Sequence, residues 1–476
     1  MKKYFLVLLC AVVIVWGIGV RFYHVDEESL WSDEAYTAIF LRDASFVDLL
    51  TGNAQDRFHP PLYYLLVEGW TSVFGDSEWA LRLPSVIIGI FLIPAVFWFA
   101  CSLTRNRSIA LCSAALTALS PLMVAYSQEA RNYGLYILIV ILHATAIWNF
   151  WNSPSNRKFW LAVGTGIIGV YAHSGFWAIL AAEAVYGIVQ MMSLHAWKSR
   201  NAWLQLIGPY LYIGMSFIPW FLRSTYPRLL QRNEEFWAPP FAFVDFGRLL
   251  SEILFVPFFS FMLVLKIVGI LAAFGIVGWL GFSRKFSKDF VYLGLLILIP
   301  VTMFALSGEW LNRYVFFIAP FLYVLIARII HNLVRAPWGN IALSILLLLS
   351  VVGAVPVYQT AFSSLQKEDW RGTVQTVRGF DDGSGRIYLN KPFARFPFSY
   401  YYNGSSDVRS PQVVNITELP KYVKSMRDFP WVAVVYNHPT DVDGVLLNAA
   451  NQVFSNHEIF AFKDIELHVF QHPRNP

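Results

Sequence analysis

Charged residues are scarce in this sequence: Asp, Glu, Lys and Arg make up 14% of its 476 residues, against about 25% in a soluble domain. The chain has only 3 cysteines, Cys10, Cys101 and Cys112, and each lies in an apolar run, where a thiol behaves as a small apolar side chain. One H-x-x-x-H pair occurs among the ten histidines, His468 and His472, but it lacks the glutamate of H-E-x-x-H, and C-x-x-C is absent. These absences exclude an ordinary soluble enzyme and a disulfide scaffold, and they argue against a zincin or zinc-ribbon site.

Nucleotide-binding motifs are missing as well, since the sequence has no P-loop, no glycine-rich dinucleotide fingerprint and no internal repeat. The net charge of +5 is too small for this length to indicate nucleic-acid binding. Energy for any chemistry must therefore come from a gradient or from an activated substrate delivered by the membrane.

Apolar residues are abundant, at 56% of the chain, and 17% of all residues are aromatic. A bilayer core needs about 20 apolar residues in helical form. Eleven runs meet this need, at 4–20, 84–103, 108–126, 133–151, 159–173, 175–192, 203–222, 259–282, 290–306, 314–331 and 340–357. No small-x-small cleavage site closes the first run, which predicts an uncleaved membrane helix. We expect an all-α polytopic membrane bundle of about 11 transmembrane helices.

Lysine and arginine in short loops predict the orientation. With the N-terminus in the cytoplasm, every cytoplasmic loop is positive, through Lys2, Lys3, Arg105, Arg107, Arg157, Lys158, Lys198, Arg200, Arg284, Lys285, Lys288, Arg328 and Arg335. The opposite loops hold most of the acids. An odd number of spans then places the C-terminus outside, and we predict a multi-pass protein of the plasma (inner) membrane.

Two segments on the predicted outer face are long. The first, 21–83, contains Pro60-Pro61 followed by an amphipathic helix predicted over 62–74. The second is the tail, where polar residues return, with strands predicted at 386–389 and 431–436 and helices near 369–380 and 417–428. We predict a membrane domain over 1–357 and a small extracytoplasmic α/β domain over 358–476.

The densest group of chemical side chains follows the first span, in Leu30-Trp31-Ser32-Asp33-Glu34-Ala35-Tyr36-Thr37. A carboxylate in a partly dry site can act as a general base. The same residues also suit a helix N-terminus, with Ser32 as the cap and the acids favoured by the helix dipole. Both interpretations can hold together.

Three further groups lie in the predicted outer loops. His59 and Arg57 precede the double proline, Glu129 and Arg131 occupy a hairpin before Tyr133, and Arg313 opens the span at 314. Guanidinium groups match phosphate oxygens, and Arg82 is a weaker candidate of the same kind. Loop termination, local ion pairs and snorkelling are the structural alternatives. Glu183, Lys266 and His143 lie within spans, where each could pair locally.

Carboxylates, a histidine and several arginines thus gather at one end of the predicted bundle. This combination suits an isoprenoid-phosphate substrate that arrives laterally from the lipid, with the arginines holding the leaving phosphate.

The order of the motifs resembles that of the GT-C membrane glycosyltransferases, in the bacterial branch grouped with protein O-mannosyltransferases and the lipid A aminoarabinose transferase. The motifs are LWSDEAYT (30–37), FHPPLYYLL (58–66), ALRLPSVIIGI (80–90), YSQEARNYGLY (126–136), NRYVFFIAPFL (312–322) and KEDWRG (367–372).

The resemblance implies transfer of a hexose or pentose from a polyprenyl monophosphate to a lipid, glycan or protein acceptor on the outer face. It implies Asp33 as the base and Glu34 as its supporting neighbour or a metal ligand. Substrate-binding roles fall to His59, Arg82, Glu129, Arg131, Tyr133 and Arg313. A divalent metal, with Glu34 and His59 as candidate ligands, stays open, because Phe58-His59 departs from the acidic residue and lysine of the aminoarabinose enzymes.

Two other classes compete with this reading. A transporter or flippase for a lipid-linked sugar would need a central polar pathway and commonly has repeated halves. A structural subunit of an envelope complex would leave the acids of the outer face unexplained.

Overall fold

The structure is a computed structural model of the whole chain. It describes residues 2–51, 53, 59–193, 195–227, 241–254, 287–307, 310–334, 338–411, 416–437 and 444–472. The chain forms two compact units. The first comprises Met1–Tyr23, Phe46–Val73 and Arg82–Gln359, and the second comprises His24–Ser45, Phe74–Leu81 and Thr360–Pro476. The second unit therefore contains the tail together with part of the first predicted outer loop, whereas the domain boundary at 357/358 stays a prediction.

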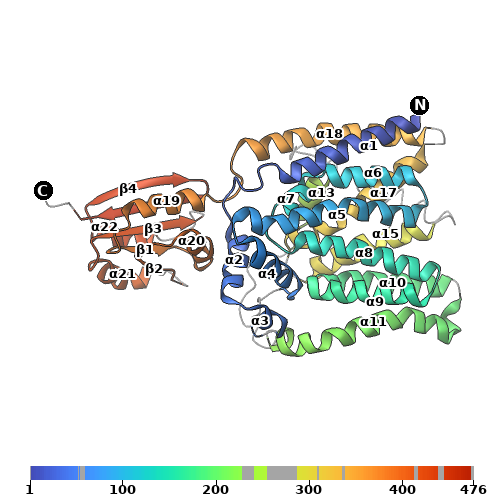
Figure 1. Ribbon diagram of the computed structural model, residues 1–476, viewed down its shortest axis with the longest axis horizontal. Helices are drawn as coiled ribbons and strands as arrows, with labels where there is room; N and C mark the ends of the chain where they lie inside the picture. Colours follow the sequence, from blue (N-terminus) through green and yellow to red (C-terminus); the bar gives the residue numbers. More distant parts are fainter. Residues whose placement is uncertain are drawn as a thin grey trace. The chain divides into compact units, whose positions relative to one another are not determined.

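The first unit is a helical bundle (Figure 1). Its long helices are α1 (Lys2–Phe22), α5 (Glu78–Thr104), α6 (Arg107–Leu119), α8 (Tyr133–Asn152), α9 (Asn156–Ala172), α10 (Phe176–Ser193), α11 (Arg200–Trp220), α15 (Lys288–Leu306), α17 (Ala319–Leu333) and α18 (Gly339–Ser363). Shorter ones are α3 (Phe46–Thr51), α4 (Leu62–Phe74), α7 (Pro121–Ser127), η1 (Ala196–Lys198), η2 (Phe221–Thr225), α13 (Phe243–Ile253), α16 (Asn312–Val315) and η3 (Phe316–Ile318).

Seven of the described helical segments are long and apolar enough to cross a membrane, and the bent pair of α6 and α7 would make eight. The predicted spans 159–173 and 203–222 are also helical, as α9 and α11, but are not among these seven. The predicted span 259–282 lies outside the described residues. The polytopic bundle is thus confirmed, whereas the total of eleven spans stays a prediction.

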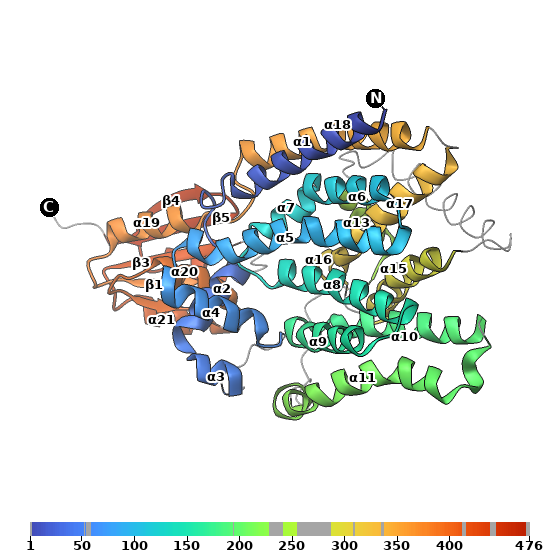
Figure 2. The same ribbon diagram turned by 45° about the vertical axis from the view of Figure 1, so that its right-hand side comes forward.

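In the bundle, α9 packs between α8 and α11, and α1 packs on α6, although α1 and α6 are far apart in sequence (Figure 2). Glycine allows close approach at one crossing, because a Cβ on Gly166 of α9 would lie 2.2 Å from the Ile213 side chain of α11. The three cysteines are free.

A buried polar group joins the helices inside the bundle. His143 Nε2 of α8 lies 3.0 Å from Glu183 Oε2 of α10, and neither side chain is exposed. The Tyr292 hydroxyl of α15 donates to Glu183 Oε1 at 3.1 Å. These two ionisable residues therefore pair locally, as the sequence allowed, because charge inside a membrane needs a partner. Lys266, the third such residue, lies outside the described part of the chain.

The second unit contains a five-stranded mixed sheet in the order β2-β1-β3-β5-β4. The strands are β1 (Arg386–Leu389), β2 (Asp407–Arg409), β3 (Trp431–Asn437), β4 (Asn456–Phe462) and β5 (Ile465–Gln471). β1 pairs in parallel with β2 and β3, whereas β5 is antiparallel to β3 and β4. Every residue of the central strand β3 is buried. The helices of the second unit are α2 (Ser32–Asp43), α19 (Trp370–Phe380), η4 (Pro392–Ala394), α20 (Arg395–Tyr401), η5 (Ile416–Glu418), α21 (Leu419–Met426) and α22 (Val445–Asn451).

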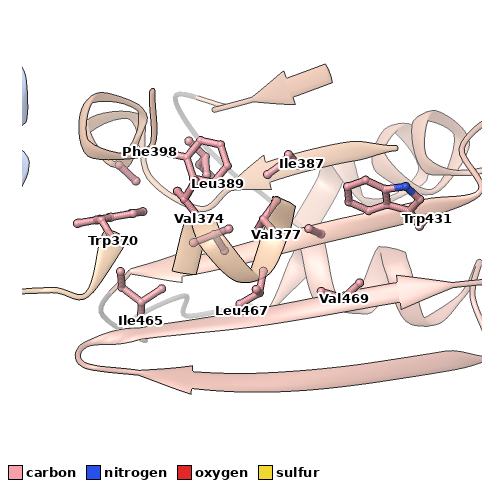
Figure 3. Packing of buried hydrophobic residues seen from close by; sticks show 13 residues of the cluster. Trp370, Val374, Val377, Ile387, Leu389, Phe398, Trp431, Ile465, Leu467 and Val469 are labelled. Atoms are coloured by element: carbon pink, nitrogen blue, oxygen red, sulfur yellow. The ribbon is translucent and has the colours of Figure 1, made fainter. Parts of the chain in front are cut away.

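Helices cover both faces of this sheet. On one face, Trp370, Val374 and Val377 of α19 and Phe398 of α20 pack against Ile387, Leu389, Trp431, Ile465, Leu467 and Val469 of the strands (Figure 3). On the other face, α21 and α22 cover Val432, Val434 and Phe470. The alternation of the strands separates the two cores. The predicted α/β tail is confirmed, including both predicted strands and both predicted helical stretches.

Candidate active site

The hairpin that carries Glu129 and Arg131 is fixed by the break between α6 and α7. Pro121 lacks an amide hydrogen and cannot continue α6, and Ser120 caps the new helix by accepting from the Met123 amide at 3.2 Å. The two helices consequently differ in direction by 60°. Ser85 of α5 anchors the hairpin, since its hydroxyl donates to the Arg131 carbonyl at 3.4 Å. The Tyr63 hydroxyl of α4 reaches Ser85 at 3.3 Å.

His59, directly before α4, lies within electrostatic range of Arg131 and Arg313. Its pKa is held well below the usual value, first because burial disfavours the imidazolium and then because both guanidiniums repel it. His59 is 8% exposed and Arg131 is 6% exposed. Among the described residues, His59 Nδ1 has no hydrogen-bond partner. The structure thus brings three of the predicted residues together as a neutral imidazole beside two cations.

His173 lies next to His59, and Tyr136 lies next to His173, although the sequence motifs assign neither residue a role. The His173 ring stacks on Tyr136 with centroids 4.3 Å apart and lies 5.1 Å from the His59 ring. His173 Nδ1 accepts from the Gly175 amide at 2.9 Å. Tyr136 is 1% exposed, and its hydroxyl has no hydrogen-bond partner among the described residues. The available signal was the interruption of the apolar stretch 159–192 at His173-Ser174-Gly175.

Tyr133 begins α8 and packs on Tyr126 and Phe316, with ring centroids 5.1 and 5.9 Å away. Tyr126 in turn lies within electrostatic range of Glu129 and Arg313. These two predicted residues therefore lie near the start of α8, where Tyr133 packs on Tyr126. Arg82 is 1% exposed and lies three residues before Ser85 in α5, on the same helix face. Arg57 lies outside the described residues.

Asp33 and Glu34 lie in the second unit, in the first turn of α2. The helix N-terminus is as expected, but the cap position is Trp31 and shows no side-chain cap bond, so the prediction that Ser32 caps the helix is wrong. An extended backbone at Trp31 starts the helix one residue earlier than a serine cap would. Asp33 is half-buried, whereas Glu34 is fully buried. Lys367 Nζ of the tail lies 3.1 Å from Glu34 Oε2.

The two candidate metal ligands do not fit a metal centre. Nowhere in the described parts of the chain do three or more His, Cys, Asp or Glu side chains come together as a metal site would require. Glu34 already has an ammonium group on its carboxylate, and His59 has two guanidiniums in electrostatic range. Both surroundings disfavour an additional cation.

The two units therefore present complementary chemistry. The first offers two guanidiniums and neutral hydrogen-bonding rings, which suit an anion such as a phosphate. The second offers a half-buried carboxylate that can accept a proton, next to a buried, paired one.

The chain is similar to known proteins in part of its sequence and in its fold. Residues 58–221 match the family model described as dolichyl-phosphate-mannose-protein mannosyltransferase. A search of curated protein sequences gave no significant match.

Solved structures are similar over nearly the whole chain. ArnT from Cupriavidus metallidurans in the apo state has a TM-score of 0.62 at 12% identity, with 98% of each chain covered. The same protein bound to undecaprenyl phosphate has a TM-score of 0.60 at 13% identity, again with 98% of each chain covered. The archaeal oligosaccharyltransferase AglB from Archaeoglobus fulgidus has a TM-score of 0.53 at 12% identity, covering 97% of this chain and 74% of AglB.

The resemblance drawn from the motifs is thereby confirmed. Residues 58–221 match the mannosyltransferase family model, and the chain forms a polytopic membrane bundle whose fold is similar to that of ArnT.

Proposed function

We propose that this protein is a glycosyltransferase that moves a sugar from a polyprenyl-phosphate donor to an acceptor on the outer face of the plasma membrane. The acceptor class is a hydroxyl-bearing lipid, glycan or protein, and the sugar is a hexose or pentose. In this proposal the N-terminus is cytoplasmic and the second unit is extracytoplasmic.

The chemical step exchanges one C–O bond for another. The acceptor hydroxyl attacks the anomeric carbon while the bond from that carbon to the phosphate oxygen breaks, with inversion at carbon. The electron pair of the broken bond stays on the departing polyprenyl monophosphate. The acceptor proton passes to the Asp33 carboxylate. The transferred sugar needs no nucleotide, because the phosphoester bond to its anomeric carbon supplies the driving force.

Donor binding is assigned to the first unit. Arg131 and Arg313 neutralise the phosphate as its charge grows in the transition state. His59 supplies a neutral hydrogen-bonding atom beside them, and Glu129 orients Arg131 or binds the sugar. Arg82 and Tyr133 complete the set of substrate-binding residues.

One observation carries the proposal: His59 lies buried within electrostatic range of two guanidiniums, with a ring nitrogen that no described residue satisfies. Guanidinium groups match phosphate oxygens, and an imidazole nitrogen near them can take part in the same binding. ArnT, whose fold the chain shares, has been solved bound to undecaprenyl phosphate, and AglB in complex with a dolichol-phosphate. These ligands belong to the class that the site suits.

The test uses the full-length protein in lipid vesicles with a panel of radiolabelled polyprenyl-phosphate sugars. We expect the wild type to remove label from at least one donor, and the destination of the label identifies the acceptor. If the wild type consumes none of the donors but moves lipid-linked sugar between leaflets in a saturable way, the proposal is overturned in favour of a flippase.

A further inference from the structure

Each residue of one segment at the start of the tail makes a defined contact. This segment is Lys367-Glu368-Asp369-Trp370-Arg371-Gly372. Asp369 caps α19 by accepting from the Gly372 amide at 2.8 Å, and a Cβ on Gly372 would lie 2.4 Å from the Asp369 carboxylate. Trp370 is fully buried in the core between α19 and the sheet. This segment therefore begins the folded tail domain, with its glycine required for close packing around the cap.

The same segment binds the stretch 26–34 that precedes and begins α2. The Ser29 hydroxyl donates to the Glu368 carbonyl at 2.7 Å and accepts from the Trp370 amide at 3.1 Å. Arg371 donates to the carbonyl of Asp26 at 3.0 Å and pairs with the Glu78 carboxylate.

Two further hydrogen bonds join the stretch before α2 to the tail. The Leu30 amide donates to the Tyr401 hydroxyl at 2.7 Å, and the Gln366 amide donates to the Glu28 carboxylate. The acidic end of α2 is thus held by side chains and backbone more than 300 residues away in sequence.

Lys367 makes the contact nearest to the proposed base. Its ammonium lies 3.1 Å from Glu34 Oε2, and the Glu34 side chain is fully buried while that of Lys367 is 19% exposed. A buried carboxylate needs positive compensation, and removal of a charged partner weakens that compensation. Neighbouring Glu368 cannot compete for Lys367 freely, since its carboxylate accepts from the Trp370 indole at 2.9 Å and from the Asn437 amide at 3.2 Å.

We propose that Lys367 is a positioning residue that takes the place of a divalent cation at the Asp33-Glu34 pair. Its ammonium fixes Glu34 and thereby the first turn of α2, from which Asp33 acts on the acceptor. The tail domain is then part of the catalytic apparatus rather than a separate acceptor-binding module, and turnover needs no metal. This inference rests on the proposed function.

The experiment measures donor consumption by the full-length protein in lipid vesicles for wild type, Lys367→Ala and Lys367→Met. We expect the wild-type rate to stay within about twofold after treatment with EDTA. We expect Lys367→Ala to lower kcat by about 10- to 100-fold, the range typical for loss of a residue that orients a catalytic group. The KM for the donor should stay within about twofold, since the donor phosphate is bound elsewhere.

Chemical rescue separates positioning from folding. Ethylammonium added to Lys367→Ala should restore part of kcat with saturation, which a merely misfolded variant would not show. Lys421→Ala is the matched control, because Lys421 pairs with Glu418 at 2.9 Å on the surface of the same unit. Its activity should equal that of the wild type. If Lys367→Ala does not fold, Lys367→Met keeps the apolar stem and is tested in the same assays.

A wild-type kcat in Lys367→Ala or Lys367→Met would overturn the inference, as would loss of wild-type activity in EDTA that Mg²⁺ or Mn²⁺ restores. Either result leaves the proposed function intact, because the wild type still consumes donor. A wild type that consumes no donor from the panel contradicts the proposed function itself.

Discussion

The region around Glu34 and the region around His59 differ in how a buried ionisable side chain is accommodated. In the second unit, Glu34 is fully buried but paired with Lys367 at 3.1 Å. In the first unit, His59 is buried beside Arg131 and Arg313, and the result is a neutral imidazole rather than a compensated charge. The Glu34–Lys367 pair is a compensated buried charge, whereas the guanidiniums near His59 suit an anion such as a phosphate.

This difference indicates which of the two regions binds the charged group of the substrate. A satisfied pair orients its neighbours without a ligand, which is what a base such as Asp33 requires. Guanidinium groups near a buried imidazole offer a phosphate charge-assisted hydrogen bonds. The following predictions test this division, from the largest expected effect to the smallest.

Replacement of the base should have the largest effect. Asp33→Asn should lower kcat by about 10²–10⁴-fold, the usual contribution of general base catalysis, with little change in melting temperature because Asp33 is only half-buried. Asp43→Asn, at the exposed end of the same helix, is the control and should keep the wild-type rate. Full activity in Asp33→Asn would remove Asp33 as the base.

Loss of a guanidinium should be the next largest effect, and it should appear in donor binding. Arg313→Ala should lower kcat/KM by roughly 10- to 150-fold, as expected from about 1.5–3 kcal/mol for a charged hydrogen bond. Arg313→Lys should recover part of this, since lysine keeps the charge but loses the planar fork.

Arg223 provides the comparison for this variant. It is an exposed arginine that donates to Asn53 at 2.6 Å. Arg223→Ala should leave kcat/KM unchanged, and an equal loss in both variants would show that general positive charge, rather than Arg313 itself, holds the donor.

Removal of the Tyr136 hydroxyl should have a smaller effect. Because no described residue satisfies this buried oxygen, we infer that it bonds to substrate. Tyr136→Phe should raise the donor KM by about 2- to 10-fold, corresponding to one neutral hydrogen bond, without loss of thermal stability. Tyr171→Phe is the control, since the Tyr171 hydroxyl already donates to the Ser216 carbonyl at 2.9 Å, and it should leave the donor KM unchanged. An unchanged KM in Tyr136→Phe would exclude Tyr136 from the donor site.

The smallest effect concerns pH. Because the pKa of His59 is lowered in the folded state, the unfolded chain binds a proton near its ordinary pKa of about 6.5 while the folded protein does not. Stability should therefore fall as the pH drops below about 6.5, by up to about 1.4 kcal/mol per pH unit. In His59→Gln the melting temperature should fall less between pH 7 and pH 5. Equal acid sensitivity in both proteins would mean that His59 is protonated in the fold.

Apolar periodicity predicted most of the fold because each membrane helix must satisfy its own backbone. The runs 133–151 and 340–357 agree with α8 and α18 to within a few residues, except that α18 continues to Ser363. Strand alternation located β1 and β3 equally well. The sequence did not predict that α2 packs with α20 in the second unit, because tertiary contacts between distant segments leave no local pattern.

The candidate site was predictable to the same extent. Helix-end motifs identified His59, Arg131 and Arg313, and the structure places His59 within electrostatic range of both arginines. The sequence assigned no role to His173, or to Lys367 of the KEDWRG motif, since a lone histidine in a turn and a lysine in a polar tail have many uses. Their roles depend on a ring stack and an ion pair that only the folded chain forms. The cap at Trp31 was missed because serine propensity is weaker than the backbone geometry imposed there.

The division between donor binding and proton transfer is tested most directly by equilibrium binding of undecaprenyl phosphate to Asp33→Asn and to Arg313→Ala, side by side with the wild type in the same lipid. The account predicts that Asp33→Asn binds within about twofold of the wild type, whereas Arg313→Ala binds at least about 10-fold more weakly. Equal affinity in all three proteins, or an equal loss in both variants, would contradict it.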